Sequence, residues 1–198
     1  MKEKRFMILE KTDSKLELLD GGEDGVIYLE GVFTEFNVRN RNNRIYSAED
    51  FLPKLEALRP RIKNKTLLGE LDHPSNFDVS LSNASHVIED LQYDRENNRI
   101  VGRIRLLNTR AGKDAQALVR DGIPLHISSR AAGNIDAAGH VTLTSLFTYD
   151  LVADPGFEDA QLHRVFNESY TFDGCKDVQT KCLNEQFGFT NNPNVRVK

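Results

Sequence analysis

The sequence predicts an α+β protein with a curved or barrel-like antiparallel β-sheet core flanked by helices. Several segments are rich in β-branched and aromatic residues, as strands are, whereas only two segments have helical periodicity. The segments do not follow a strict β-α-β alternation, which argues against a parallel sheet. At 198 residues the chain is long enough for one domain with a substantial core and a tail.

The strands are expected in order along the chain. Residues 26–38 predict a long strand with a bend at Gly31, because they are rich in Val, Ile, Phe and Tyr. Residues 94–98, of composition Asp-Arg-Glu-Asn-Asn, predict the turn of a hairpin. The strands of that hairpin and two later strands are expected at residues 84–93, 99–107, 124–129 and 141–152.

Two helices are expected between these strands. Ser47 resembles an N-cap, with Asp50 three residues later and apolar residues at helical spacing from Phe51 to Leu58. Pro53 weakens the middle of this helix or marks a late start. The second helix is expected from Thr109, as its cap, to a closing glycine at position 122.

Composition narrows the function classes. A net charge of −4 with scattered Lys and Arg argues against a dedicated nucleic-acid binder. No apolar run reaches the length of a membrane span, and the N-terminal apolar patch is too short for a secretory signal, so a cytosolic protein is expected. Cys175 and Cys182 form no zinc pattern and are expected as free thiols. No metal or other cofactor is expected.

Two polar segments supply the groups that a nucleophilic hydrolase needs. Ser128 and Ser129 lie at the end of the short strand expected at residues 124–129, where either hydroxyl is accessible. His73 lies in a loop, and a neutral imidazole is the usual base for a serine. Asp150 lies at the end of an apolar strand, where its carboxylate needs a partner such as an imidazole N–H.

An oxyanion needs donors beside the nucleophile. The backbone N–H groups near Ser129 and the side chain of Arg130 follow the first serine directly. Both are therefore candidates for oxyanion support.

Other residues compete for the roles of acid and base. Glu70 and Asp72 are close to His73 in the sequence and are alternatives for the orienting acid. His86 and His126 are weaker candidates for the base, and His86 is better interpreted as a histidine satisfied within a strand. A metal site built from the same acids and histidines matches no established spacing and is the weaker interpretation.

An ordered set of segments resembles the prohead core proteases of large tailed bacteriophages, a family that looks related to the herpesvirus maturation protease assemblin. The set covers residues 26–160. Its members are Gly31–Phe33, Asn40–Tyr46, Leu68–Pro74, Ile88–Asp90, Gly102–Arg105, Ile127–Arg130 with Gly133, and Asp150–Val152 with Pro155.

The resemblance implies an assemblin-like fold and a serine endopeptidase of the Ser-His-Asp type. By this resemblance Ser128 is the nucleophile, His73 the base and Asp150 the third member. Arg130 matches the family's arginine, and its role at the oxyanion is our own interpretation.

The resemblance also implies where the protein acts and on what. Its substrates would be scaffold or core proteins and the major capsid protein, cut mostly after glutamate inside the procapsid in the host cytoplasm. Neither nucleic acid nor a membrane would be required, and association of several copies stays open. The alternative is a procapsid core protein with this fold and no activity.

Self-cleavage is a further implication. Ile8-Leu9-Glu10 and Leu183-Asn184-Glu185 both place an apolar residue two positions before a glutamate, so Glu10 and Glu185 are candidate sites. We therefore expect a processed N-terminal extension over residues 1–25 and a protease domain over residues 26–164. Residues 165–198, which lack periodicity, are expected to be a flexible, processed tail.

Overall fold

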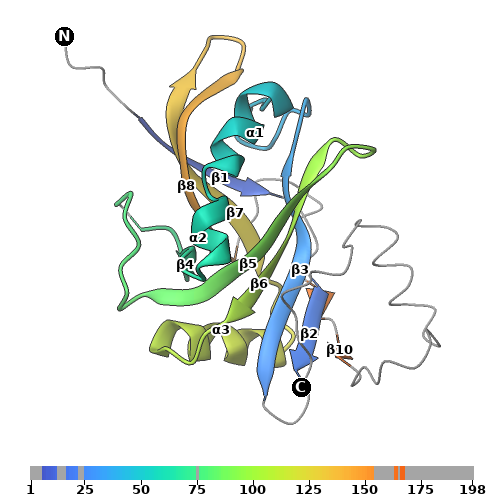
Figure 1. The fold of residues 1–198 in the computed structure, drawn as a ribbon, viewed down its shortest axis with the longest axis vertical. Coiled ribbons are helices and arrows are strands. Elements are labelled where there is room, and N and C mark those ends of the chain that lie inside the picture. The colour runs from blue at the N-terminus through green and yellow to red at the C-terminus, as the bar shows by residue number, and fades with distance from the viewer. Residues whose placement is uncertain are drawn as a thin grey trace.

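The computed structural model describes residues 6–12, 17–21, 25–74, 76–153, 163–164 and 166–167, with side chains in 25–74 and 76–153. Two sheets and three helices make up this part of the chain (Figure 1). The strands are β1 (Phe6–Thr12), β2 (Glu17–Gly21), β3 (Val26–Glu35), β4 (Leu68–Glu70), β5 (Ala84–Asp94), β6 (Arg99–Leu106), β7 (His126–Ile135), β8 (Val141–Val152), β9 (His163–Arg164) and β10 (Phe166–Asn167). The architecture is therefore α+β, dominated by antiparallel sheets, as the sequence predicts.

The larger sheet has the strand order β10-β2-β3-β6-β5-β4, with β9 paired to β3. Its neighbours are antiparallel except β10 and β2. The hairpin of β5 and β6 forms as predicted, around the turn at residues 95–98. The bend of β3 arises from a register shift between Val32 and Thr34, close to the expected position at Gly31.

The smaller sheet has the order β1-β7-β8 and is antiparallel throughout. The strand expected to end at Ser129 continues to Ile135, because residues 130–135 stay paired with β8. The serine pair therefore lies inside a strand and not at its end. The two sheets meet where residue 71, directly after β4, forms a bridge to Leu151 of β8.

The helices begin and end where the sequence provides caps. In α1 (Ala48–Glu56) the Ser47 side chain accepts a hydrogen bond from Asp50 N, and Pro53 lies inside the helix. In α3 (Arg110–Arg120) the Thr109 side chain accepts from Gly112 N. Gly122, at φ 76°, closes α3 in a Schellman motif, in which Ile123 N bonds to Leu118 O.

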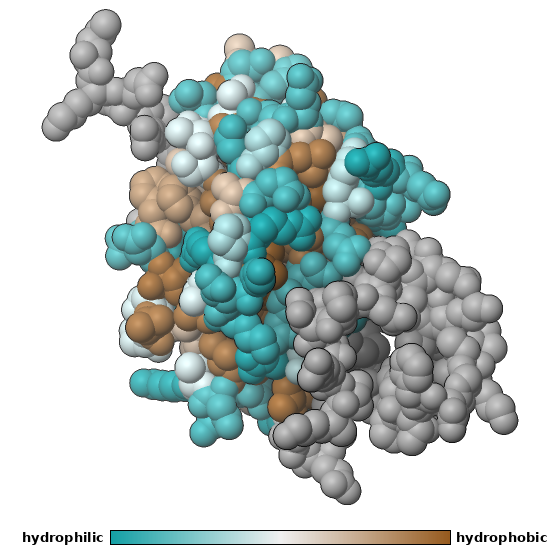
Figure 2. Space-filling model, in the orientation of Figure 1, coloured by the Kyte–Doolittle hydropathy of each residue, from teal (hydrophilic) through white to brown (hydrophobic). Residues whose placement is uncertain are grey.

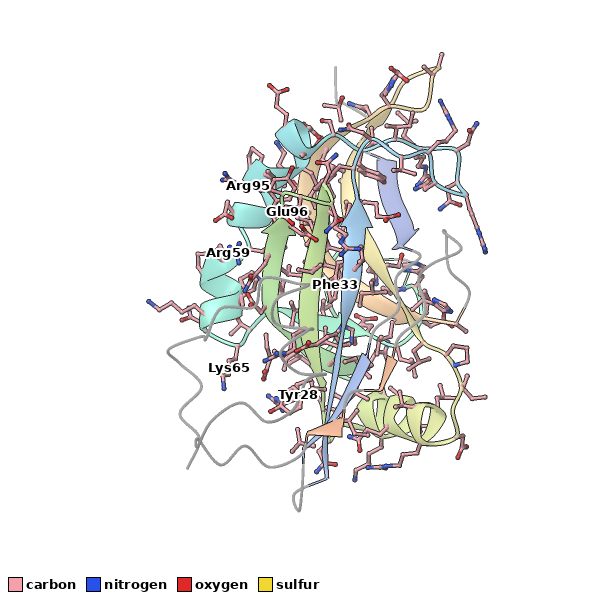
Figure 3. All side chains as sticks on the ribbon, turned by 90° about the vertical axis from the view of Figure 1, so that its right-hand side faces the viewer. Tyr28, Phe33, Arg59, Lys65, Arg95 and Glu96 are labelled. Atoms are coloured by element: carbon pink, nitrogen blue, oxygen red, sulfur yellow. The ribbon has the colours of Figure 1, made fainter. Side chains whose placement is uncertain are left out.

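The third helix, α2 (Arg59–Lys63), was not expected from the sequence. Arg59 of α2 donates to the backbone oxygen of Leu91 on β5, so this helix is tied to the larger sheet. Figure 3 shows α1 and α2 beside the hairpin of β5 and β6, and α3 near the other end of β3.

One hydrophobic core lies between the elements and joins both sheets. Phe33 of β3 packs edge-on against Tyr149 of β8, with ring centroids 5.0 Å apart. Figure 3 labels Phe33 on the C-terminal half of β3. Hydrophilic residues cover much of the face seen in Figure 2, with small hydrophobic areas between them. No helix among the described residues is long and apolar enough to cross a membrane.

The structure describes part of the expected N-terminal extension and tail, and the division into processed ends and a protease domain stays a prediction. Residues 6–12 pair with β7 and residues 17–21 pair with β3, so much of the expected N-terminal extension is built into the sheets. The sequence did not predict these two strands, because residues 1–25 are rich in charged residues. Of the expected C-terminal tail, residues 166–167 pair with β2, and residues 168–198 lie outside the described part of the chain.

Candidate active site

His73 is positioned by the junction of the two sheets. Leu71 bridges to Leu151, and Asp72 N donates a 2.7 Å hydrogen bond to Leu151 O. Asp72 has φ 71°, the left-handed conformation that short polar residues tolerate. The chain therefore turns sharply at Asp72, and His73 follows directly beside β8.

The segment before His73 contains a glycine at position 69, where a side chain would not fit. A Cβ atom at this position would lie 2.1 Å from Tyr149 O and 2.3 Å from His86 Nε2. Neither neighbour is a flexible chain end, because one is backbone and the other is a fully buried ring. Glycine at position 69 therefore permits the close contact of β4 with β8 on which the position of His73 depends.

Ser128 and His73 meet across the fold. The Ser128 Oγ lies 2.8 Å from His73 Nε2, within hydrogen-bond distance, although the residues are 55 positions apart in the chain. Ser128 has no exposed surface, whereas the His73 side chain is 15% exposed. The imidazole is therefore the accessible side of the pair.

Asp150 lies opposite Ser128 on the neighbouring strand, which puts both side chains on one face of the sheet. Its Oδ2 is 3.7 Å from His73 Nδ1, longer than a hydrogen bond, and that nitrogen has no hydrogen-bond partner in the described residues. Burial alone would raise the pKa of Asp150. The contacts with His73, Arg130 and the Glu70 N–H outweigh burial and hold the pKa below its usual value.

Arg130 is the centre of the buried polar network and has no exposed surface. Its Nε donates a 2.8 Å bond to Asp150 Oδ2, and its Nη2 bonds to Oδ1 of the same carboxylate. Its Nη1 contacts the backbone oxygens of residues 76, 77 and 78 at 3.2 to 3.4 Å. One guanidinium thus joins the acid to the loop that follows His73.

These contacts differ from the expected role of Arg130. The sequence suggested that its charge faces an oxyanion, but each guanidinium nitrogen has a partner in the carboxylate or the loop. Sequence reasoning missed the pair with Asp150. An arginine in a strand of small and apolar residues was the available signal, because a buried cation requires an anionic partner.

The two alternative acids have partners other than the His73 ring. Glu70 is 2% exposed, its Oε1 accepts from Ser80 N, and the same oxygen is 3.8 Å from Arg130 Nη2. Asp72 is exposed, and its carboxylate accepts from the backbone N of His73. Asp150 is the carboxylate that contacts the His73 ring.

The other histidines have different surroundings. His86 is fully buried between Ser85 Oγ and Tyr149 O, at 2.9 and 3.1 Å. Burial lowers the pKa of His86 to about 4, in spite of the nearby Asp150, so the ring is neutral at physiological pH. This agrees with its interpretation as a satisfied histidine. His126 is buried, and His140 is exposed beside Asp136.

The remaining candidate residues are Glu10, Glu185 and Ser129. Glu10 lies on β1, whose backbone is described without side chains, and Glu185 lies outside the described residues. Ser129 pairs with Tyr149, so its side chain points to the opposite face of the sheet from Ser128. Within the described part of the chain, no three His, Cys, Asp or Glu side chains converge to hold a metal ion.

The geometry provides the parts for acyl transfer. It brings together a hydroxyl, an imidazole at hydrogen-bond distance and an ionised carboxylate held by an arginine.

Comparisons with known proteins identify the family of this chain. A family model described as "Prohead core protein serine protease" matches residues 6–151. The prohead core protein protease of Enterobacteria phage T4 is 32% identical over 127 residues, which are 61% of this chain. The same alignment covers 58% of the T4 protein, so this chain spans less than two thirds of that relative's length.

A solved structure has the same fold. The structure of the bacteriophage T4 capsid assembly protease, gp21, superposes with a TM-score of 0.69 at 26% sequence identity. The match covers 77% of this chain and 99% of the gp21 chain. With the family model matching well over half of its length, this chain belongs to the prohead core protein serine protease family.

Proposed function

We propose that this protein is a serine endopeptidase of phage capsid assembly, with Ser128 as nucleophile, His73 as base and Asp150 as orienting acid. The observation that carries the proposal is the 2.8 Å contact between Ser128 Oγ and His73 Nε2. Membership of the prohead core protease family supports the reaction type.

In the proposed mechanism Ser128 Oγ attacks the scissile carbonyl while His73 Nε2 accepts its proton. His73 then protonates the leaving amine, and water releases the acyl-enzyme by the same steps. Asp150 orients the ring through Nδ1, and the 3.7 Å separation shortens when the imidazole is charged. The imidazolium that forms lies beside the ionised Asp150, whose negative charge stabilises it in the transition state.

Arg130 acts in this mechanism as a positioning residue. It fixes both oxygens of Asp150 and holds the backbone of residues 76–78, just after His73. One side chain therefore holds the acid and the loop that follows the base. Oxyanion support comes from the backbone near Ser129 and not from the guanidinium.

The substrates follow from the family. We propose that the enzyme cuts core and capsid proteins within the procapsid, in the infected host cell, preferentially after glutamate. Self-cleavage after Glu10 and Glu185 belongs to the same proposal, with the segments before residue 26 and after residue 164 as the processed ends.

The test compares intact masses of the purified protein with those of Ser128→Ala and of a matched control, Ser145→Ala, on the same hairpin. We expect fragments ending at Glu10 or Glu185 for wild type and Ser145→Ala, and the intact chain for Ser128→Ala. Addition of purified core and capsid proteins extends the test to substrates in trans. Absence of Ser128-dependent cleavage in both assays would favour an inactive core protein instead.

A further inference from the structure

The N-terminal strand lies directly along the strand that carries Ser128. All seven residues of β1 pair antiparallel with β7, and the register sets Lys11 opposite Ser128 and Glu10 opposite Ser129. In the described residues β1 forms the outer edge of the smaller sheet, with β7 as its one ladder partner. Figure 1 shows β1 crossing the molecule beside β7, with its C-terminal end towards β3.

This is the position that an extended peptide would take on the enzyme. Peptides commonly bind by adding a strand to a free sheet edge, where backbone hydrogen bonds fix their direction and register. Without β1, the outer edge of β7 would be such an edge, and it passes the Ser128 nucleophile. The peptide bond between Glu10 and Lys11 lies next to that residue in the register.

The backbone amides near Ser128 also indicate that a peptide would bind at the outer edge of β7. Successive residues of a strand direct their N–H groups to opposite neighbours, so of Ser129 and Arg130 one points to β8 and the other to β1. The amide on the β1 side is therefore available to the strand that occupies this edge, whether β1 or a substrate. Oxyanion support for a second peptide on that side requires that β1 has left the edge.

We infer that the outer edge of β7 binds extended peptide substrates, and that β1 is its occupant in cis. Residues 6–12 thus act as a built-in pseudosubstrate that blocks the site until the strand leaves or is cut after Glu10. The inference rests on the proposed function, because it assigns the substrate-binding edge of the same site. A tethered occupant has an effective concentration of about millimolar, so a free peptide of weaker affinity competes poorly with it.

A reversible lock tests this in the full chain. Met7 and Ala132 are cross-strand partners, and partners in an antiparallel pair have Cα atoms about 4.5–5.5 Å apart, which suits a disulfide. Met7→Cys with Ala132→Cys is made in a background in which Cys175 and Cys182 are Ser. The probe is a quenched fluorescent peptide of residues 4–16.

We expect the oxidised lock to cleave the peptide at least 10-fold more slowly than its reduced form. The matched control is a disulfide between Asn134→Cys and Thr142→Cys, exposed partners farther along β7 and β8. Oxidation of this pair leaves the rate unchanged. Equal rates for the oxidised and reduced Met7–Ala132 lock would overturn the inference and leave the protease proposal standing.

A binding measurement separates the two proposals if cleavage is absent. In the Ser128→Ala background, fluorescence anisotropy compares peptide affinity for the oxidised lock, the reduced lock and Leu9→Pro, whose proline lacks the N–H for a strand ladder. We expect the weakest binding for the oxidised lock and at least 10-fold tighter binding for Leu9→Pro. Equal affinities in all three would overturn the inference, whether or not the protein cleaves.

Discussion

The two central hairpins of the molecule use the same pairing for different purposes. The hairpin of β5 and β6 buries apolar residues such as Ile88 and Ile104. Its charged pairs, Arg105 with Glu89 and Arg99 with Asp94, keep part of their side chains exposed. The hairpin of β7 and β8 buries Arg130 and Asp150 completely.

The two hairpins differ in whether they bury a charged pair completely. Burial of a charged pair costs desolvation that is often not regained, and a hydrophobic pair of similar volume is frequently as stable or more so. The hairpin of β5 and β6 provides core contacts without this cost. The hairpin of β7 and β8 accepts this cost on the face that carries Ser128, where the proposed mechanism requires an oriented carboxylate. The predictions below separate the two roles.

The largest effect is expected for the nucleophile. Ser128→Ala should lower kcat/KM on the residue 4–16 peptide by at least about 10⁴-fold, because a triad loses its function when the nucleophile is removed. Ser145→Ala, on the same hairpin, should stay within about twofold of wild type. Similar urea midpoints for both variants would show that the loss concerns chemistry and not folding. A Ser128→Ala protein with wild-type activity would contradict the assignment.

Arg130→Met should cost about 3–5 kcal/mol of unfolding free energy, since it leaves Asp150 buried without its counterion. Arg130→Met combined with Asp150→Leu should regain most of this stability and remain inactive. Urea denaturation and peptide cleavage measure the two effects separately. If the single and double variants were equally unstable, packing and not charge would be the dominant contribution of Arg130.

His86 should make stability depend on pH. The unfolded histidine takes up a proton near its ordinary pKa of 6.5, whereas the folded one does so only near 4. Stability is therefore complete above about pH 6.5 and falls as the pH drops to 4, by roughly 3 kcal/mol. Asp150, with its lowered pKa, loses its contribution at lower pH.

The measurement is the unfolding free energy in urea at pH 7, 6, 5 and 4. His86→Gln, which cannot titrate, should be less stable at pH 7 and show a flatter profile between pH 6.5 and 4. An identical slope for the variant and wild type would assign the pH dependence to other groups.

The smallest effect is expected in the larger sheet. A Cβ atom at Gly102 of β6 would lie 2.7 Å from side-chain atoms of both Leu91 and Phe33. Gly102→Ala should therefore cost about 1–3 kcal/mol by overpacking. Its kcat/KM per folded molecule should be that of wild type, in contrast to Arg130→Met. A thermal unfolding curve and the peptide assay test both statements, and a selective loss of activity would link the larger sheet to the site.

Local signals in the sequence were enough for much of the fold. Alternation and turn residues located the β5–β6 hairpin, and the Thr109 cap with Gly122 located α3, because these features depend on neighbours in the chain. They were not enough for β1, whose partner β7 is more than 100 residues away, or for the continuation of β7 beyond Ser129. Ladder partners distant in sequence decide such strands.

The site shows the same distinction between features that local sequence predicts and features that depend on distant partners. Ser128, His73 and Asp150 were identifiable because their chemical types and the resemblance to a family pointed to them, and the structure brings them together. The engagement of Arg130 with Asp150 and with the loop at residues 76–78 was not identifiable. It depends on how β7, β8 and this loop converge, which no local pattern in the sequence records.

The crowding at Gly69 has a consequence for how this family should diverge. A lineage that lost its activity would be free to replace Ser128 or His73, yet any side chain at position 69 would still collide with Tyr149 O and His86. Glycine at this position is thus expected to outlast the chemistry. Descendants that keep the glycine at position 69 and have lost the serine at position 128 would be inactive proteins with the same fold. These two positions would distinguish their sequences from those of active proteases.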